Sequence, residues 1–199
     1  MEIINRRLFS VVLCMALCSL AAADNVIVIV RHGEKPANGL GQLSCQGLNR
    51  ALALAPLVIA KYGRPIALYA PNPALKKKDG GIPFFYVRPL ATIEPLAIQT
   101  GLPISLDWGM KDINPLADAL ILHTEGMQVV AWEHHWAESL AKQLLQKTGG
   151  NSKQVPEWKD LDFDSMYIIH ISTDVHGKTT STFSLEAEGL NGQPDQCPR

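Results

Sequence analysis

Apolar residues follow one another along this chain in two kinds of pattern, unbroken runs and helical spacings. The run from Val26 to Val30 shows no alternation, which is typical of a central strand that is covered on both faces of a sheet. Further strands are predicted over 65–73 and 127–132. Two final strands, over 165–172 and 180–190, are predicted to form an antiparallel hairpin at the edge of the sheet.

Helices are predicted between these strands. Ser44 is a candidate cap for a helix that reaches Tyr62, and Pro56 is expected to kink or split it. A second helix is predicted over 88–101, with Pro89 in its first turn and Gly101 as its C-terminal cap. Shorter and longer amphipathic patterns predict two more helices, over 115–122 and 136–147.

Strands and helices therefore alternate and end in a hairpin. This order predicts an α/β fold, a three-layer α/β/α domain with a mostly parallel central sheet and a C-terminal antiparallel hairpin at the edge. Residues 24–199 are expected to form one domain, because they contain neither an internal repeat nor a linker. The segment 74–87 is interpreted as an insertion, with Lys76, Lys77 and Lys78 in a solvated loop; the alternative is that these lysines help to gather anionic ligands.

The first residues are expected to be a signal peptide rather than part of the fold. Arg6 and Arg7 precede a short apolar run, Leu8 to Leu20, and Ala21 to Ala23 suit cleavage before Asp24. Residues 1–23 are therefore predicted to direct export to the periplasm or the medium, with no stable membrane insertion after cleavage. An uncleaved anchor is the alternative.

Composition and cysteine content add two constraints. The chain has 199 residues, 47% of them hydrophobic, and a formal charge of -1, so it has no basic excess that would indicate a nucleic-acid partner. Beyond the signal peptide only Cys45 and Cys197 remain, and an oxidising compartment favours a disulfide between them. Two unrelated thiols are the alternative. The oligomeric state is left open.

Polar clusters follow two of the predicted strands. Arg31-His32-Gly33-Glu34 comes directly after the first, and Glu133-His134-His135 comes after the strand over 127–132. Ligands of open α/β sheets bind beyond the carboxyl ends of the strands. With Arg88 at the start of a helix, these groups would form a pocket for a compact dianion such as phosphate, and a neutral histidine there can attack phosphorus.

The stretch VIVRHGEKP resembles the signature of the histidine phosphatase (phosphoglycerate mutase-like) superfamily. YAPNP, VRPLATIEPLA and VVAWEHHW follow in the order that the resemblance requires, so it covers residues 26–171. The resemblance implies a phosphomonoesterase that works through a phosphohistidine intermediate on a small phosphorylated substrate. It implies no metal and no organic cofactor.

The resemblance also implies a role for each residue. His32 would be the catalytic nucleophile, and Arg31, Arg88 and His134 would bind the phosphoryl oxygens. Glu34 would orient His32 or face the substrate. His135 follows His134 and would line the rim of the pocket or begin the helix, and His134 is favoured as the phosphate ligand because it lies closer to the strand end.

The general acid is the less defined part of the prediction. The segment ISLDWGMKDINP follows the arginine helix, and Asp112 is the candidate in it, with Asp107 as the second choice. The chain also departs from the common pattern of the family. Pro71-Asn72-Pro73 stands where many members have a serine, and an insertion that ends in Phe84-Phe85-Tyr86 precedes Arg88. These aromatic residues are expected in the core or in the pocket wall.

Three other functions compete with this prediction. A metal site at Glu133-His134-His135 lacks the spacing of known metal motifs, since adjacent histidines rarely point at one ion. A phosphoryl mutase would use the same pocket, but export removes it from glycolytic substrates. A non-catalytic phosphate- or ligand-binding protein of the same fold is the third alternative.

Overall fold

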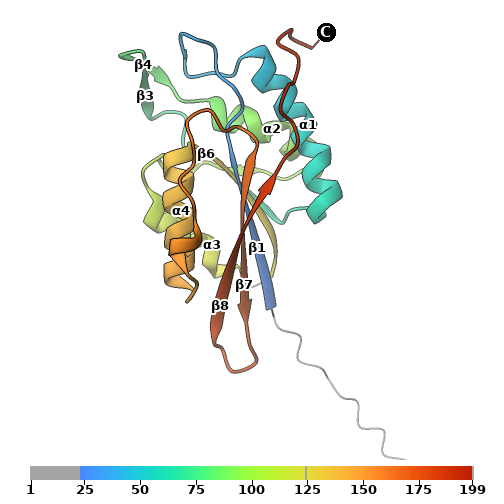
Figure 1. The fold of residues 1–199 in the computed structure, drawn as a ribbon, viewed down its shortest axis with the longest axis vertical. Coiled ribbons are helices and arrows are strands. Elements are labelled where there is room, and N and C mark those ends of the chain that lie inside the picture. Colours follow the sequence, from blue (N-terminus) through green and yellow to red (C-terminus); the bar gives the residue numbers. More distant parts are fainter. Residues whose placement is uncertain (1–22, 124, 199) are drawn as a thin grey trace, which may run out of the picture.

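A computed structural model describes residues 23–123 and 125–198; the predicted signal peptide, apart from Ala23, lies outside them. Its central sheet has six strands in the order β5-β2-β6-β1-β7-β8. Four of them are parallel to one another, and β7 and β8 run antiparallel as a hairpin that ends at the sheet edge. The predicted fold class is confirmed (Figure 1). The strands are β1 (Ala23–Arg31), β2 (Ala67–Tyr69), β5 (Ile104–Ser105), β6 (Gly126–Trp132), β7 (Ser165–Thr173) and β8 (Thr179–Ala187).

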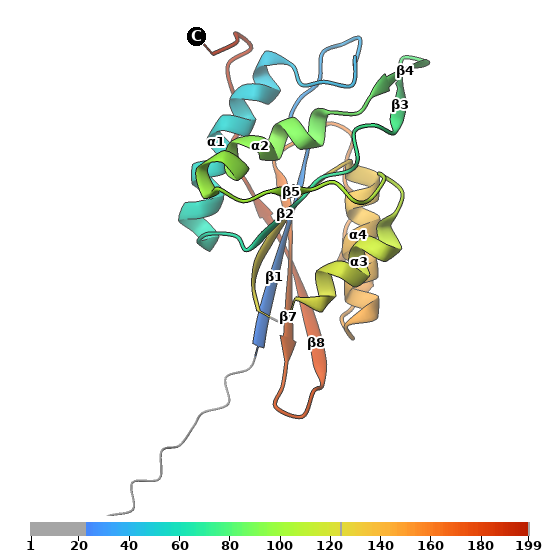
Figure 2. The same cartoon turned by 180° about the vertical axis from the view of Figure 1, so that it is seen from behind.

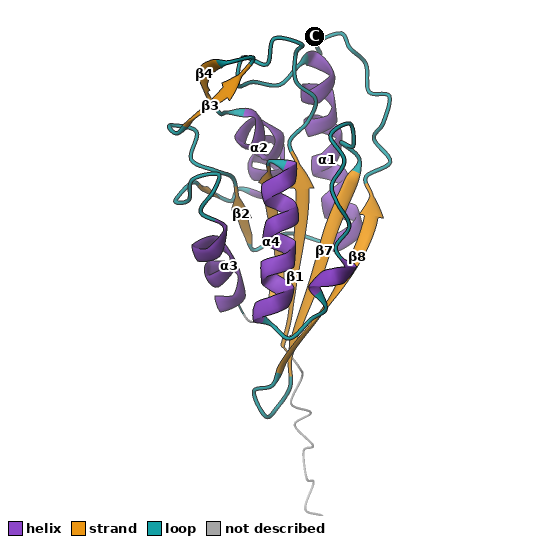
Figure 3. Cartoon of the chain, turned by 60° about the vertical axis from the view of Figure 1, so that its left-hand side comes forward, coloured by secondary structure: helices purple, strands orange, loops and turns teal. Residues whose placement is uncertain are grey.

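Helices cover both faces of this sheet, as Figures 2 and 3 show from two sides. The helices are α1 (Cys45–Tyr62), α2 (Arg88–Thr100), α3 (Ile113–Leu122), α4 (His134–Lys147) and the short 3-10 helix η1 (Ser152–Gln154). The side chains of strand β1 point alternately to the helix layer on each face of the sheet. Ile27 and Ile29 pack into a core with α3 and α4, whereas Val28 and Val30 pack into a core with α1 and α2. Both sides of β1 are buried, as the unbroken apolar run predicts.

The helix ends follow the expected chemistry. Ser44 caps α1, and its side-chain oxygen accepts a hydrogen bond from the Gly47 N–H. Gly101 ends α2 in the left-handed conformation. Of the two outcomes expected at Pro56, splitting does not occur, because α1 continues through this residue to Tyr62. The packing of α1 against the core offsets the loss of the backbone hydrogen bond that Pro56 cannot donate.

The segment before α2 differs from the expectation. Lys76 to Lys78 do not lie in a loop but in β3 (Lys76–Asp79), which pairs with β4 (Ile82–Phe85) in a separate two-stranded sheet. Gly80 and Gly81, both with positive φ, form the turn between them. This hairpin projects above the end of the sheet where β1 ends and α4 begins (Figure 3).

The C-terminal tail is fastened to α1. Cys45 and Cys197 form the predicted disulfide, which joins positions 152 residues apart. The Asn49 side-chain amide also donates to the carbonyl oxygens of Pro194 and Gln196. These bonds hold the tail along α1 (Figure 1). Among the helices of the described residues, none is long and apolar enough to cross a membrane.

Candidate active site

The two polar strand ends lie next to each other. β1 and β6 are paired in parallel with Arg31 opposite Trp132, and the His32 N–H donates to the Trp132 carbonyl oxygen at 3.0 Å. The next residues on the two strands, His32 and Glu133, therefore leave the sheet side by side. His134, which follows Glu133, is the first residue of α4, so its backbone belongs to a helix N-terminus. The polar residues after β1 and after β6 therefore form one cluster.

His32 is held in a defined protonation state. Its Nδ1 lies 2.7 Å from the Gly33 carbonyl oxygen, which can only accept, so Nδ1 carries the proton and Nε2 presents its lone pair. Burial, first, and then the positive charges of Arg88 and Arg31 lower the pKa of His32 well below its usual value. Only 3% of the residue is exposed. His32 is therefore a neutral imidazole with a nucleophilic nitrogen.

Helix α2 fixes the turn that follows His32. The Gly33 N–H donates to the Thr92 hydroxyl at 2.9 Å, and this hydroxyl donates to the Arg88 carbonyl oxygen. Gly33 also lies against Gly47 of α1, where a Cβ would come within 2.7 Å of the Gly47 carbonyl oxygen. A side chain at position 33 would therefore separate the turn from α1, and this close contact explains the glycine.

The two arginines are buried and anchored by their outer nitrogens. Arg31 Nη1 donates to three backbone carbonyl oxygens in the segment 159–162, at 2.7 to 3.2 Å. Arg88 Nη1 donates to the Asp79 carboxylate at 2.6 Å, and Asp79 is itself buried at the end of β3. The Nε atom of each arginine is buried without a hydrogen-bond partner among the described residues. Both cations are thus rigid, and the Nε donor of each is unused.

His134 is placed in the same way. Its Nε2 lies 2.7 Å from the Asp160 carboxylate, so Nε2 carries the proton of the neutral ring. Its Nδ1 is buried without a hydrogen bond in the part of the chain that the structure describes, and it lies 3.3 Å from Glu133 Oε1. Burial and then the charge of Arg31 lower the pKa of His134, whereas Asp160 and Glu133 oppose this shift. A dianion near Nδ1 would favour the protonated ring, in which both nitrogens donate.

Tyr86 completes this group, although the sequence pattern assigns it no chemical role. Its ring meets His32 edge-on with 5.9 Å between centroids, and the Arg88 guanidinium lies 4.8 Å from the ring centroid. Its hydroxyl is buried and has no partner among the described residues. Burial raises the pKa of Tyr86, and the charge of Arg88 only partly opposes this, so the hydroxyl stays protonated and can donate.

Four of the unpartnered buried atoms in the described structure thus belong to this cluster. They are Nε of Arg31, Nε of Arg88, Nδ1 of His134 and the hydroxyl of Tyr86. A buried polar atom without a partner costs about 1–3 kcal/mol. Atoms of this kind concentrated around a neutral histidine indicate a ligand with several acceptor oxygens.

Lys77 also lies at this cluster, although the lysine run to which it belongs is typical of a solvated loop. It lies on β3 with its Nζ 3.2 Å from Glu133 Oε1 and 5.0 Å from the Tyr86 ring centroid. Its charge contributes to the lowered pKa of His32. Burial alone would raise the pKa of Glu133, but Lys77 and His134 hold it below its usual value. Lys77 and Glu133 are therefore a partly buried ion pair at the edge of the cluster.

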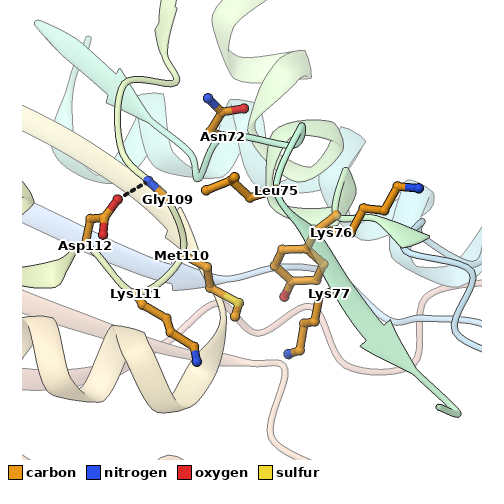
Figure 4. A pocket seen from close by; sticks show the side chains of 9 residues that line it. Asn72, Leu75, Lys76, Lys77, Gly109, Met110, Lys111 and Asp112 are labelled. Carbon is orange, nitrogen blue, oxygen red and sulfur yellow. Dashed lines mark hydrogen bonds between the residues drawn. The ribbon is translucent and has the colours of Figure 1, made fainter. Parts of the chain in front are cut away.

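A pocket of about 310 Å³ opens beside Tyr86 and Lys77. The segment 109–112 forms its opposite wall, and Asp112 lies there with its carboxylate accepting a hydrogen bond from the Gly109 N–H at 2.8 Å (Figure 4). Asp107, the second candidate acid, binds the Ser105 hydroxyl at a different surface hollow. Of the two, Asp112 is thus the one that shares a pocket with Tyr86.

Glu34 is directed elsewhere. Both its carboxylate oxygens accept hydrogen bonds from Arg50, which is 0% exposed and also pairs with Asp164 and Glu188. This ion cluster joins the turn after His32 to α1 and to the end of β8. A role of Glu34 at the substrate stays a prediction, because the hydrogen bonds of its carboxylate support the fold.

Metal-ligand atoms occur at one place in the described residues. Oxygen and nitrogen atoms of Glu133, His134 and His135 lie within 4.8 Å of one another. The rings of His134 and His135 lie with centroids 4.0 Å apart at a tilt of 35°, and Nε2 of both rings faces the Asp160 carboxylate rather than an open point. His135 is exposed, and its Nε2 lies 3.8 Å from Asp160. We assign no metal to these residues.

The structure brings together His32, Arg31, Arg88 and His134, the residues that the strand ends and the arginine helix indicated. Their catalytic and binding roles stay predictions. The signal for Lys77 was available in the Gly80-Gly81 pair, which predicts a hairpin and hence alternation of buried and exposed residues along β3. Tyr86, expected in the core or in the pocket wall, lines the pocket.

Comparison with known proteins supports the fold only. No protein-family model matches the chain, and no curated protein matches it in sequence. Among solved structures, the chain is similar to a phosphoserine phosphatase from Entamoeba histolytica, a histidine-to-alanine mutant in complex with phosphoserine. The TM-score is 0.50 at 12% identity, over 84% of this chain and 98% of that one. The two chains thus share a fold.

Proposed function

We propose that this protein is an exported phosphomonoesterase that works through a phosphohistidine on His32. The observation that carries the proposal is the set of unpartnered donors on Arg31, Arg88 and Tyr86 beside a neutral histidine, with the unpartnered Nδ1 of His134 able to donate once that ring is protonated. A phosphoryl group supplies the acceptor oxygens that these donors lack. Arginine and an uncharged hydroxyl suit it, because its charge spreads over the oxygens in the transition state.

The reaction takes two steps. Nε2 of His32 attacks phosphorus, the bond from phosphorus to the ester oxygen breaks, and the leaving alcohol takes a proton. Asp112 is the proposed proton donor, since its pocket adjoins Tyr86 and offers room for the leaving group. Water then attacks the phosphohistidine and gives a proton to the Asp112 carboxylate, the P–N bond breaks, and inorganic phosphate leaves. Neither step requires a metal or an organic cofactor.

Three further features support the proposal. The fold is shared with a phosphatase whose complex holds phosphoserine, a phosphomonoester. The disulfide between Cys45 and Cys197 fits an oxidising compartment and hence export. Finally, the Gly33 carbonyl fixes the tautomer that leaves Nε2 free, which a nucleophilic histidine needs.

The test is phosphate release from an aryl phosphate without added metal and with a chelator present. His32→Ala is expected to abolish release, and His170→Ala, a change of an exposed histidine on β7, is the matched control that keeps it. An acid-labile phosphoenzyme should form in the wild type only. If phosphate raises the melting temperature but no ester is hydrolysed, the chain is a phosphate-binding protein instead.

A further inference from the structure

The pocket next to the cluster has a chemistry of its own. Its apolar surface comes from Leu75, Met110 and the ring of Tyr86. Lys77 and Lys111 place their amino groups on the same side of the pocket, on either side of the Met110 side chain (Figure 4). An apolar floor with two cations at one rim suits a small ligand that has a carbon frame and a terminal negative charge.

Tyr86 and Lys77 connect this pocket to the phosphoryl site. Tyr86 lines the pocket and also contacts His32 edge-on. Lys77 lines the pocket, and its charge acts on His32. A phosphomonoester with its phosphorus at His32 would therefore direct its leaving group past Tyr86 into this pocket.

Lys111 is the cation at the far end of that path. It is exposed, its Nζ lies 6.0 Å from the Trp136 ring centroid on α4, and it makes no ion pair with any of the described residues. The carboxylate of Asp112 is turned to the Gly109 N–H. Lysines outnumber carboxylates along the pocket wall, so the pocket carries a net positive charge.

We infer that the substrate's leaving group carries a second anionic group, a phosphate or a carboxylate, which Lys111 binds together with Lys77. The substrate class is thus a small phosphomonoester with two separated negative groups, rather than the phosphate ester of an uncharged alcohol. This inference rests on the proposed function of the same site and names its substrate class.

A series with one carbon frame tests the inference. Propyl phosphate has an uncharged leaving group, whereas propane-1,3-diyl bisphosphate and 3-(phosphonooxy)propanoate add a second phosphate or a carboxylate. We expect kcat/KM for both doubly charged esters to exceed that for propyl phosphate by about tenfold, and the ratio to fall at high salt. The two esters also distinguish the second phosphate from the carboxylate.

The variant is Lys111→Met, which keeps the length of the stem and removes the charge. It should lower the ratio between doubly charged ester and propyl phosphate about two- to fivefold, the range expected for an exposed ion pair. Lys153→Met, a change of an exposed lysine in η1, is the matched control and should leave the ratio unchanged.

Binding separates this inference from the proposed function. In His32→Ala, which lacks the nucleophile, calorimetry should give a Kd for the bisphosphate about tenfold lower than for propyl phosphate, and Lys111→Met should reduce this difference about two- to fivefold. Equal kcat/KM values for the three esters, with His32-dependent turnover, would overturn the substrate class and leave the phosphatase intact. Absence of turnover in all of them, with unequal Kd values, would overturn the phosphatase and leave the anion subsite.

Discussion

Replacing Tyr86 with phenylalanine should raise the unfolding free energy of the free protein and lower kcat/KM. The hydroxyl of Tyr86 is buried without a partner among the described residues, although the ring around it is packed against His32 and Arg88. Removing an unsatisfied buried hydroxyl and keeping the ring should recover about 1–3 kcal/mol of unfolding free energy. For a domain of this size, each kcal/mol raises the melting temperature by about 2–4 °C.

The same hydroxyl should stabilise the phosphoryl group when substrate is bound. Its pKa is raised by burial, so it is a proton donor throughout the working range. A hydrogen bond to a charged group contributes about 1.5–3 kcal/mol. Tyr86→Phe should therefore lower kcat/KM for an aryl phosphate about 10- to 100-fold.

Urea unfolding and steady-state kinetics measure both effects on one preparation. Tyr167→Phe is the matched control, because Tyr167 is equally buried but its hydroxyl donates to the Pro156 carbonyl oxygen at 2.8 Å. This control should lose about 1 kcal/mol and keep its kcat/KM. The reasoning fails if Tyr86→Phe is destabilising, or if it turns over the ester as fast as the wild type.

Two more predictions concern the segments that hold the site in place. Changing Cys45 and Cys197 to serine opens a link between positions 152 residues apart and should cost up to about 5 kcal/mol in urea unfolding; an unchanged midpoint would contradict this. Glu188 is paired with Arg50, and burial raises its pKa to about 8, so the wild type should lose stability as pH rises from its unfolded pKa to about 8. Glu188→Gln removes this dependence. The difference in unfolding free energy between Glu188→Gln and the wild type should therefore shift by about 2–3 kcal/mol in favour of the variant from pH 6 to pH 9, and parallel pH profiles of the two proteins would refute the assignment.

The layers of the fold and the strand-end cluster were predictable because they depend on local patterns. An unbroken apolar run such as Val26 to Val30 must be covered on both faces, and the two cores on either side of β1 do cover it. The tight turn at Gly33 was also visible. Its cause, the contact with Gly47 of α1, was not, because it joins two segments only in the folded chain.

The hairpin shows where the sequence was harder to interpret. Lys76 to Lys78 look like a solvated charge run, but pairing of β3 with β4 turns Lys77 and Asp79 inward and leaves Lys76 and Lys78 exposed. Asp79 then becomes the partner of Arg88. Period-two alternation is meaningful only once the strand is recognised, so both inward residues were missed.

Glu34 shows a different limit, since its partner is distant in the sequence. Arg50 gathers Glu34, Asp164 and Glu188 from three parts of the chain, and no local pattern indicates that these acids share one cation. A carboxylate next to RHG therefore reads as part of the site, although its contacts in the fold are with a buried ion cluster. Sequence spacing alone does not distinguish a carboxylate that faces the substrate from one that is part of a buried ion cluster.

The distribution of unsatisfied groups links stability to function in this molecule. Folding normally pairs buried polar atoms, yet unpartnered buried polar atoms among the described residues are concentrated around His32, while Arg31 and Arg88 are firmly anchored by their other nitrogens. Because these side chains are held rigidly, they cannot turn to find hydrogen-bond partners for the unpartnered atoms. The free protein therefore keeps the unfavourable free energy of these buried atoms. An anion that fits would recover that cost on binding, which is why the same arrangement that weakens the free fold should bind phosphate tightly.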